Sequence, residues 1–208
     1  MRSLPTLATL LLWSPAVIAE TYRGYELPPY VIEERSEDIE IRRYAPHLLA
    51  VVTVDGDQNA AVSKGFRILA AYIFGKNAGT QKVAMTVPVS QEPAKISMTA
   101  PVTQRTNGGA WDVAFMMPAT WTRDTLPSPL NADIRFEETK SEILVVRRFP
   151  GWATTGRIAT ESARLRQSAA KAGLATEGDV RVMYYDDPFT VPWRRRNEVA
   201  LRVAPLEN

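Results

Sequence analysis

The stretch KVAMTVPVSQEPAKISMTAPV, from Lys82 to Val102, contains nearly the same five residues twice, as MTVPV and then MTAPV. Apolar residues alternate in both copies, at Val83, Met85, Val87 and Val89 and then at Ile96, Met98, Ala100 and Val102. Successive side chains of a strand point to opposite faces, so an antiparallel hairpin that pairs Val89 with Ile96 puts all of them on one face. The polar residues 90–95 predict the turn, and the proline in each copy predicts a bulge, a strand end or an outward-facing position.

Alternating or continuous apolar runs predict further strands on both sides of this stretch. They cover Val31–Glu34, Glu40–Tyr44, Leu48–Val54, Trp111–Met117, Ile134–Glu138, Ile143–Phe149, Val180–Tyr185 and Glu198–Val203. The sequence Thr106-Asn107-Gly108-Gly109 is typical of a tight hairpin turn. The three prolines between Pro118 and Ala132 predict a long surface loop.

Two segments have the period of an amphipathic helix. Between Ala60 and Phe74 the apolar residues are spaced by three and four, with Asp57 or Asn59 as a candidate N-cap and Gly75 as a stop. The second helix is predicted from Ile158, Leu165, Ala169 and Ala172, and Gly173 ends it.

The motifs around the helices repeat as well. Ile41-Arg42-Arg43-Tyr44-Ala45-Pro46 precedes the first helix, and Val146-Arg147-Arg148-Phe149-Pro150 precedes the second. Two similar halves, each roughly strand, helix and strands, predict an α+β domain with an internal duplication.

The first nineteen residues are typical of a secretory signal peptide. Arg2 is followed by an apolar stretch, Leu4–Ile18, and Val17-Ile18-Ala19 fits a cleavage site after Ala19. We therefore expect residues 1–19 to be removed, residues 20–30 to form an N-terminal arm and residues 31–208 to form one domain. The expected location is periplasmic or secreted. The alternative is an N-terminal membrane anchor, for which the apolar stretch is short.

Composition excludes several kinds of site. The chain has no cysteine, which rules out disulfides, thiolate zinc sites and thiol nucleophiles. Its formal net charge of +2 requires neither nucleic acid nor an anionic membrane as a partner. Nucleotide-binding loops, the nucleophile elbow and the zinc-protease motif are all absent from the sequence.

Few residues remain as candidate ligands. His47, the single histidine, is either one axial ligand to a haem iron or an ordinary histidine near a turn. Met85 and Met98 either line a pocket for a flat apolar ligand or pack in the core, and the same choice holds for Met116, Met117 and Met183. Arg194-Arg195-Arg196 is either a clamp for carboxylates such as haem propionates or a solvated charge run, and Lys64 and Arg67 on the first helix offer the same charge.

Taken in order, these segments resemble the SOUL/haem-binding protein family. The resemblance is carried by Ile39–Tyr44, Gly65-Phe66, Gly75-Lys76-Asn77, the doubled MT-x-PV, Leu126-Pro127-Ser128-Pro129, Tyr185 with Pro188, and Arg195-Arg196-Asn197-Glu198-Val199. It spans almost the whole chain after residue 19, and the doubled motif resembles the bacterial and plant branch.

The resemblance implies a distorted antiparallel β-barrel or strongly curved sheet with two helices from a duplicated half. It also implies binding of haem or a related tetrapyrrole in an apolar groove, without catalysis. By position, the family's proposed site falls on Ser63, Phe66, Arg67, Ala70, Ala71 and Phe74 of the first helix. Some animal members have a proposed ligand histidine where this chain has Arg43, and the basic residue before the last motif is replaced by Val191. The resemblance therefore implies haem held without a strong axial ligand.

Three functions are weighed on this basis. The first is an exported, non-catalytic binding protein for haem or another tetrapyrrole. The second is an interaction or small-effector module that uses the same fold without tetrapyrrole. The third is a tetrapyrrole-modifying enzyme, which is least favoured because the sequence has no convergent acid, base or metal set.

Overall fold

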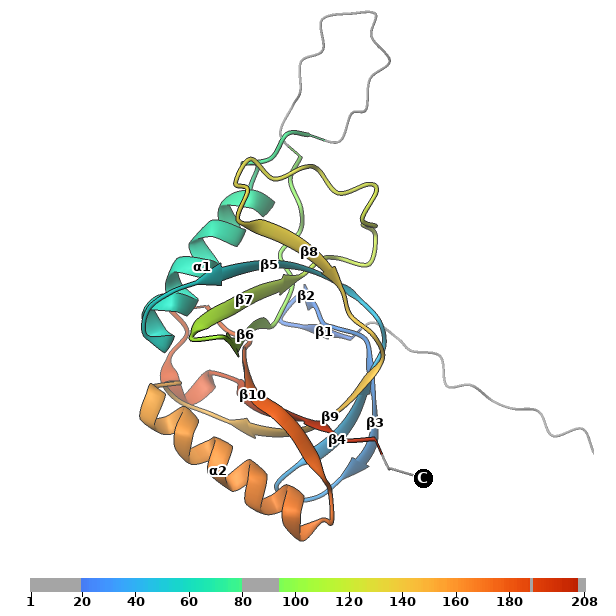
Figure 1. The fold of residues 1–208 in the computed structure, drawn as a ribbon, viewed down its shortest axis with the longest axis vertical. Coiled ribbons are helices and arrows are strands. Elements are labelled where there is room, and N and C mark those ends of the chain that lie inside the picture. Colours follow the sequence, from blue (N-terminus) through green and yellow to red (C-terminus); the bar gives the residue numbers. More distant parts are fainter. Residues whose placement is uncertain (1–19, 80–93, 188, 206–208) are drawn as a thin grey trace, which may run out of the picture.

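A computed structural model describes residues 20–79, 94–187 and 189–205 (Figure 1). The elements, in chain order, are β1 (Thr21–Tyr22), β2 (Tyr25–Glu26), β3 (Tyr30–Arg35), β4 (Glu40–Tyr44), β5 (Leu48–Val54), α1 (Gln58–Ile73), β6 (Val102–Asn107), β7 (Ala110–Met116), β8 (Ile134–Glu138), β9 (Glu142–Phe149), α2 (Thr155–Lys171), β10 (Thr176–Tyr184), the single-turn helix η1 (Pro192–Arg194) and β11 (Asn197–Val203).

The first helix begins where the sequence predicts, and both helices end where it predicts. The Asp57 carboxylate accepts hydrogen bonds from the backbone of Asn59 and Ala60 and caps α1. Beyond its last turn, Gly75 takes a positive φ of 116°, a conformation open to glycine but strained for other residues. Thr154 caps α2 in the same way, through its hydroxyl and the backbone N–H of Arg157.

Nine strands form one antiparallel sheet in the order β3-β4-β9-β11-β10-β6-β7-β5-β8. The predicted strands 31–34, 40–44, 48–54, 111–117, 134–138, 143–149, 180–185 and 198–203 are all confirmed within one to a few residues. Gly108 and Gly109, both at positive φ, make the two-residue turn between β6 and β7.

The sheet curls strongly but its edge strands β3 and β8 do not pair within the described residues, so it is not closed. The curved sheet that the resemblance implies is confirmed, whereas a closed barrel is not what the chain forms. Figure 1 shows both helices on the outside of the curve.

The sheet divides between β6 and β10 into two halves, and the strands of each half follow the same order when read outward from this division. Elements β5-α1-β6-β7 lie in space as β5-β7-β6, and β9-α2-β10-β11 lie as β9-β11-β10, with β6 paired to β10 between them. This arrangement agrees with two similar halves. The duplication of sequence itself stays a prediction.

Three clusters of buried side chains form the core. One lies between α1 and strands β5 and β7 and includes Leu69, Tyr72 and Phe115. A second lies between α2 and strands β9 and β11 and includes Leu165 and Val199. The third lies on the concave face, where Leu27, Tyr44, Leu144, Met183 and Tyr185 pack together with Tyr22 and Tyr30. The predicted N-terminal arm thus packs on the sheet.

The predicted hairpin between the two MT-x-PV copies lies partly outside the described residues, which omit 80–93. For the second copy, the sequence predicts one strand that includes Ile96, Met98, Ala100 and Val102 with these side chains on one face. This prediction is wrong, because the strand begins only at Val102 and the three earlier side chains do not share a face. Ile96 and Met98 pack in the α1 cluster, whereas Ala100 belongs to the concave cluster.

Backbone and side-chain groups of this segment bond to three different parts of the chain instead of one partner strand. Ile96 N donates to Ile73 O at 2.9 Å, and Ala100 N donates to Glu26 O at 3.0 Å. The Thr99 hydroxyl donates to Met116 O at 2.6 Å. Since these partners lie on different elements, the segment crosses from one face of the sheet to the other.

Candidate functional site

The predicted binding residues of α1 lie on its outer face. Gly65, Leu69 and Tyr72 are buried against the sheet, which leaves the remaining stripe turned outward. Ser63, Arg67 and Phe74 are exposed, and Phe66, Ala70 and Ala71 are half-buried. Phe74 has 63% of its surface exposed, although it is a large apolar side chain. The structure therefore brings the predicted residues together along one side of the helix.

Gly65 sets the distance between α1 and the sheet. A Cβ atom at this position would lie 2.6 Å from Cβ of Val113 on β7, which is closer than two carbon atoms approach. Phe66 follows and packs edge-on against Phe115, with 5.4 Å between ring centroids. The Gly-Phe pair thus fixes a close helix–sheet contact and half-buries the first aromatic ring of the stripe.

Asn77 holds the chain at the end of α1. Its amide nitrogen donates to Tyr72 O and Ala94 O at 2.9 and 2.8 Å, and its oxygen accepts from the backbone N–H of Gly79 and Ala94. Because Asn77 accepts from both, Gly79 and Ala94 lie close together beside the C-terminal end of α1. Of the two predicted methionines, Met98 packs in the α1 cluster with Phe66 and Ala70. Met85 lies outside the described residues.

The concave face of the sheet has a different character. Two adjoining cavities of about 260 and 460 Å³ share the side chains of Arg105, Glu142, Arg181 and Arg202. His47, the residue just before β5, lines the first cavity together with Leu49 and Val51 of that strand. Since Leu48, Ala50 and Val52 face α1, alternation along β5 puts His47 on the side of the sheet opposite to the predicted binding stripe.

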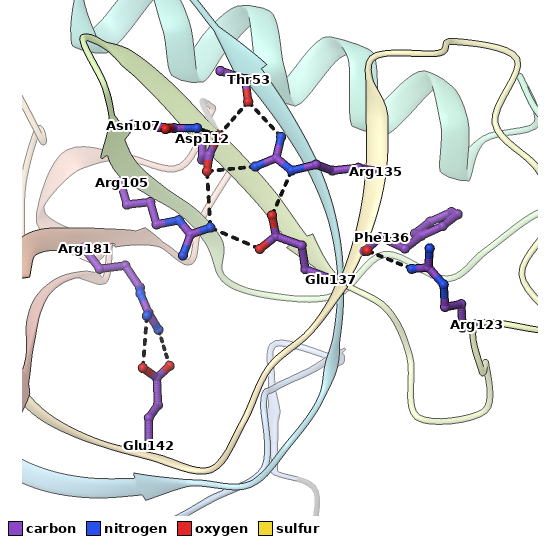
Figure 2. A network of polar contacts seen from close by, with 10 residues as sticks. All are labelled: Thr53, Arg105, Asn107, Asp112, Arg123, Arg135, Phe136, Glu137, Glu142 and Arg181. Atoms are coloured by element: carbon purple, nitrogen blue, oxygen red, sulfur yellow. Dashed lines mark hydrogen bonds and ion pairs between the residues drawn. The ribbon is translucent and has the colours of Figure 1, made fainter. Parts of the chain in front are cut away.

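Ion pairs span this concave face. Figure 2 shows Asp112 of β7 at the centre of one group, with Arg135 at 2.8 Å and Arg105 at 3.2 Å from its Oδ2. Both arginines also reach Glu137, at 2.8 and 3.1 Å. Burial on its own would raise the pKa of Asp112, but hydrogen bonds from Thr53, Asn107 and Arg135 bring this pKa below its ordinary value.

Across from this group, Arg181 of β10 binds both carboxylate oxygens of Glu142 on β9, at 2.7 and 3.2 Å (Figure 2). Sequence reasoning missed this charged face. The available signal was the single arginine within each apolar strand, at Val180-Arg181-Val182 and Leu201-Arg202-Val203. These charges come together only because the sheet is curved, and the curvature cannot be read from the sequence.

The three arginines at 194–196 lie in three different environments. Arg196 is buried and its Nη2 lies 2.7 Å from Oε1 of Glu198, while Arg195 stacks on Trp152 with 3.9 Å from its guanidinium carbon to the ring centroid. Arg194 is exposed. The run is therefore neither one clamp nor a uniformly solvated charge run.

Glu198 connects the first and last family motifs. Its carboxylate accepts from Arg42 at 2.8 and 3.0 Å and from the Tyr185 hydroxyl at 2.7 Å, in addition to Arg196. Its exposed fraction is 0%. These motif residues hold β4, β10 and β11 together inside the protein, so their role here is structural.

Within residues 20–79, 94–187 and 189–205, no group of three or more histidine, cysteine, aspartate or glutamate side chains is placed to hold a metal ion. The same ranges contain no helix with the length and hydrophobicity that crossing a membrane requires.

Comparison with solved structures supports the fold. The chain is similar to a hydrolase from Listeria innocua, with a TM-score of 0.53, 14% identity and coverage of 83% of this chain and 94% of that one. It is also similar to the EcmrR C-terminal domain, with a TM-score of 0.58, 10% identity and coverage of 81% and 98%. At these identities the likeness concerns the fold alone.

Sequence comparison gives the family. The chain is 28% identical to human Heme-binding protein 2 over 168 residues, which cover 78% of this chain and 76% of that protein. It is 27% identical to the Mus musculus protein of the same name over 127 residues, or 61% and 58% of the two chains. The family model described as SOUL heme-binding protein matches residues 25–202, nearly all of the described fold. The chain therefore belongs to the SOUL family of haem-binding proteins.

Proposed function

We propose that this protein binds haem or a related tetrapyrrole on the outer face of α1 and does so without catalysis. The observation that carries the proposal is the stripe on α1, where exposed Phe74 adjoins half-buried Phe66 and Ala70 in a chain of this family. Curated relatives named as haem-binding proteins support the choice of ligand.

The stripe has the chemistry that a porphyrin requires. Phe74 and Phe66 offer flat apolar surface, and the small side chains of Ala70 and Ala71 leave room for a macrocycle to approach the helix. Arg67 is exposed on the same side and its guanidinium suits a propionate. Binding then rests on apolar contact and one charge pair, with no strong axial bond.

Titration of the purified protein with hemin, followed through the Soret band, tests this proposal. We expect saturable binding that Phe74→Ser and Arg67→Glu each weaken by about tenfold, the loss of one buried aromatic contact or one charge pair. Trp193→Ser and Arg166→Glu are the matched controls, because both residues are exposed and lie off α1. The proposal would be refuted if the wild-type protein showed no saturable hemin binding. It would also be refuted if the control variants lost as much hemin affinity as the α1 variants.

The place of His47 makes a second readout available. Because His47 lies on the concave side of the sheet, a haem on α1 cannot use it as an axial ligand. We therefore expect His47→Ala to leave the hemin spectrum unchanged. A shifted Soret band in this variant would move the site to the concave face.

The cavities on the concave face favour one alternative, a small-effector module that does not bind tetrapyrrole. The larger cavity, about 460 Å³, has the size of a small-ligand site, yet six of its ten lining residues are acidic or basic, three of each kind. Such a lining suits a small polar molecule better than a largely apolar macrocycle. If wild-type protein ignores hemin but small polar ligands stabilise it in an Arg181-dependent manner, this alternative is correct.

The proposal also includes export, as predicted from residues 1–19. Mass spectrometry of the protein recovered from the producing cell's envelope should show Glu20 as the first residue. A protein that keeps Met1 and stays in the cytoplasm would contradict this part. Absence of catalysis is checked by incubating the protein with hemin and expecting no conversion of its absorption spectrum.

A further inference from the structure

Two loops meet beside the start of α2, and together they expose aromatic side chains. The first loop follows β9 and contains Trp152, and the second joins β10 to β11 and contains Phe189 and Trp193. Gly151 N donates to Pro192 O at 3.0 Å, which joins the loops. Figure 1 shows the second loop beside the first turn of α2. We call Trp152, Phe189, Val191 and Trp193 the aromatic loop surface.

This surface concentrates the exposed apolar groups of the described chain. Four of its eight exposed large hydrophobic side chains lie here, with exposed fractions of 57% for Trp152, 95% for Phe189, 39% for Val191 and 76% for Trp193. Isolated exposed apolar residues are ordinary on protein surfaces, but contiguous groups mark interaction sites. Four exposed apolar side chains on two joined loops therefore mark a candidate interaction surface.

The loops are built to hold these rings outward. The Asp187 carboxylate accepts from the backbone N–H of Phe189 at 2.7 Å and from the Thr190 hydroxyl at 3.1 Å, which fixes the turn below Phe189. Arg195 donates to Thr190 O at 2.7 Å while its guanidinium covers Trp152. These hydrogen bonds of Asp187 and Arg195 thus support the backbone at Phe189 and Thr190.

The charge around the rings is positive. Arg194 is exposed beside Trp193, and Arg195 lies over Trp152. Of the two nearby carboxylates, Asp186 pairs with Arg23 at 2.9 Å, whereas Asp187 is exposed and accepts a hydrogen bond from the backbone N–H of Phe189. The first turn of α2 contains no acidic residue, so the positive end of its dipole is not offset there.

We propose that the aromatic loop surface docks the protein on a membrane rich in anionic phospholipid. Tryptophan and phenylalanine with flanking arginine are the side chains that favour the boundary between lipid headgroups and acyl chains. Phe189, with almost no neighbouring atoms, would need a matching pocket on a protein partner, whereas a bilayer accepts a protruding ring without one. The side chains of Phe189 and Trp193 enter the interface, and Arg194 contacts lipid phosphates.

Flotation with lipid vesicles, in the absence of haem, tests the docking. Wild-type protein should bind vesicles of phosphatidylcholine with phosphatidylglycerol, bind pure phosphatidylcholine much less, and show a blue shift of tryptophan emission. The double variant Phe189→Ser with Trp193→Ser should lower the partition coefficient by at least about tenfold, since two rings lose their burial. Arg194→Glu should weaken binding to the anionic vesicles, and added salt should do the same.

Matched controls separate this docking from general stickiness and from the haem proposal. Phe74→Ser and Arg166→Glu remove an exposed ring and an exposed arginine elsewhere, so both should float as the wild type does. Failure of wild-type protein to bind anionic vesicles, or equal losses in the controls, would overturn the docking. A change in sedimentation mass of the double variant, with no vesicle binding by wild type, would assign the surface to contact between copies instead.

Discussion

At the scale of single residues, Glu198 belongs to a motif of the family, yet its contacts stabilise the fold and do not form a binding site. Burial would raise the pKa of this carboxyl, but hydrogen bonds from Arg42 and the charges of Arg42 and Arg196 hold the pKa below its ordinary value. The carboxylate therefore stays ionised inside the protein. The buried Arg196 depends on it as an ion-pair partner, while Arg42 also pairs with Glu40 at 2.6 Å.

Glu198→Gln keeps the shape of the side chain and removes its charge. We expect it to lower the free energy of unfolding by about 3–5 kcal/mol at neutral pH, since buried arginine charge loses its partner. Urea unfolding followed by circular dichroism measures this. Glu177→Gln is the control, because Glu177 is half exposed and its contact with Arg202 is 3.4 Å, so its loss should cost under about 1 kcal/mol.

The wild type and the Glu198→Gln variant should also differ in how their free energy of unfolding depends on pH. Because the pKa of Glu198 is lower in the folded than in the unfolded chain, its stabilisation is complete above the ordinary value of about 4.3 and is lost as pH falls below it. The unfolding free energy of the wild type should therefore drop in acid more steeply than that of the Gln variant. Parallel slopes in the two proteins would contradict the lowered pKa.

His47 gives a second prediction at this scale. Burial lowers its pKa below the ordinary value of 6.5, although the hydrogen bond to Ala45 O opposes this effect. Nearby Arg181 lowers the pKa further and Glu142 raises it; Arg105 and Lys140 also line the cavity. Since it is the single histidine, its Hε1 proton should give one NMR signal that titrates with a midpoint below pH 6.5.

The urea-unfolded chain supplies the reference for that titration, in which His47 should return to about 6.5. The lowered pKa also means that the folded state loses stability as pH falls below this value, because only the unfolded chain then takes up the proton. A folded-state midpoint at or above the unfolded one would show that the imidazole is open to solvent or paired with a carboxylate.

At the scale of elements, the contact between α1 and β7 depends on the missing side chain of Gly65. Gly65→Ala should destabilise the fold by about 1–3 kcal/mol, because the added methyl group overlaps Val113 and this outweighs the better helix propensity of alanine. Thermal or urea unfolding measures the change.

Gly156→Ala is the matched control for this substitution. Gly156 is also in a helix, but nothing lies within 4 Å of a Cβ atom built there. Alanine should therefore be neutral or stabilise α2 by up to about 1 kcal/mol. If both substitutions stabilise the protein, the spacing of α1 from the sheet is not set by Gly65.

The elements were largely predictable because local signals agree with their final environment. Alternation in 48–54 and the helical stripe in 58–73 persist in the structure, and Asp57 and Gly75 bound α1 as predicted. Residues 96–100 also alternate, yet the backbone N–H groups of Ile96 and Ala100 donate to Ile73 and Glu26, which are distant in sequence. Local alternation therefore misled where tertiary partners decide the path.

At the scale of the whole molecule, the curved sheet has two faces with separate roles. The helices and two apolar clusters fill the convex face, and the concave face combines ion pairs with the third cluster. The site residues on α1 were predictable, because a helix stripe is a local property. The charged cavities and the aromatic loop surface were not, since they arise where strands or loops far apart in sequence converge.

The segment before β3 completes this architecture by covering part of the concave face. Leu27 is 2% exposed and packs with Tyr44, Leu144 and Met183, which lie on three strands. Leu27→Ala should lower the free energy of unfolding by about 2–5 kcal/mol, because it removes buried methyl groups and leaves a cavity among rigid strands. Leu130→Ala, at a 69% exposed position, should change it by less than about 0.5 kcal/mol. Equal effects in urea unfolding would mean that the segment is not part of the folded core.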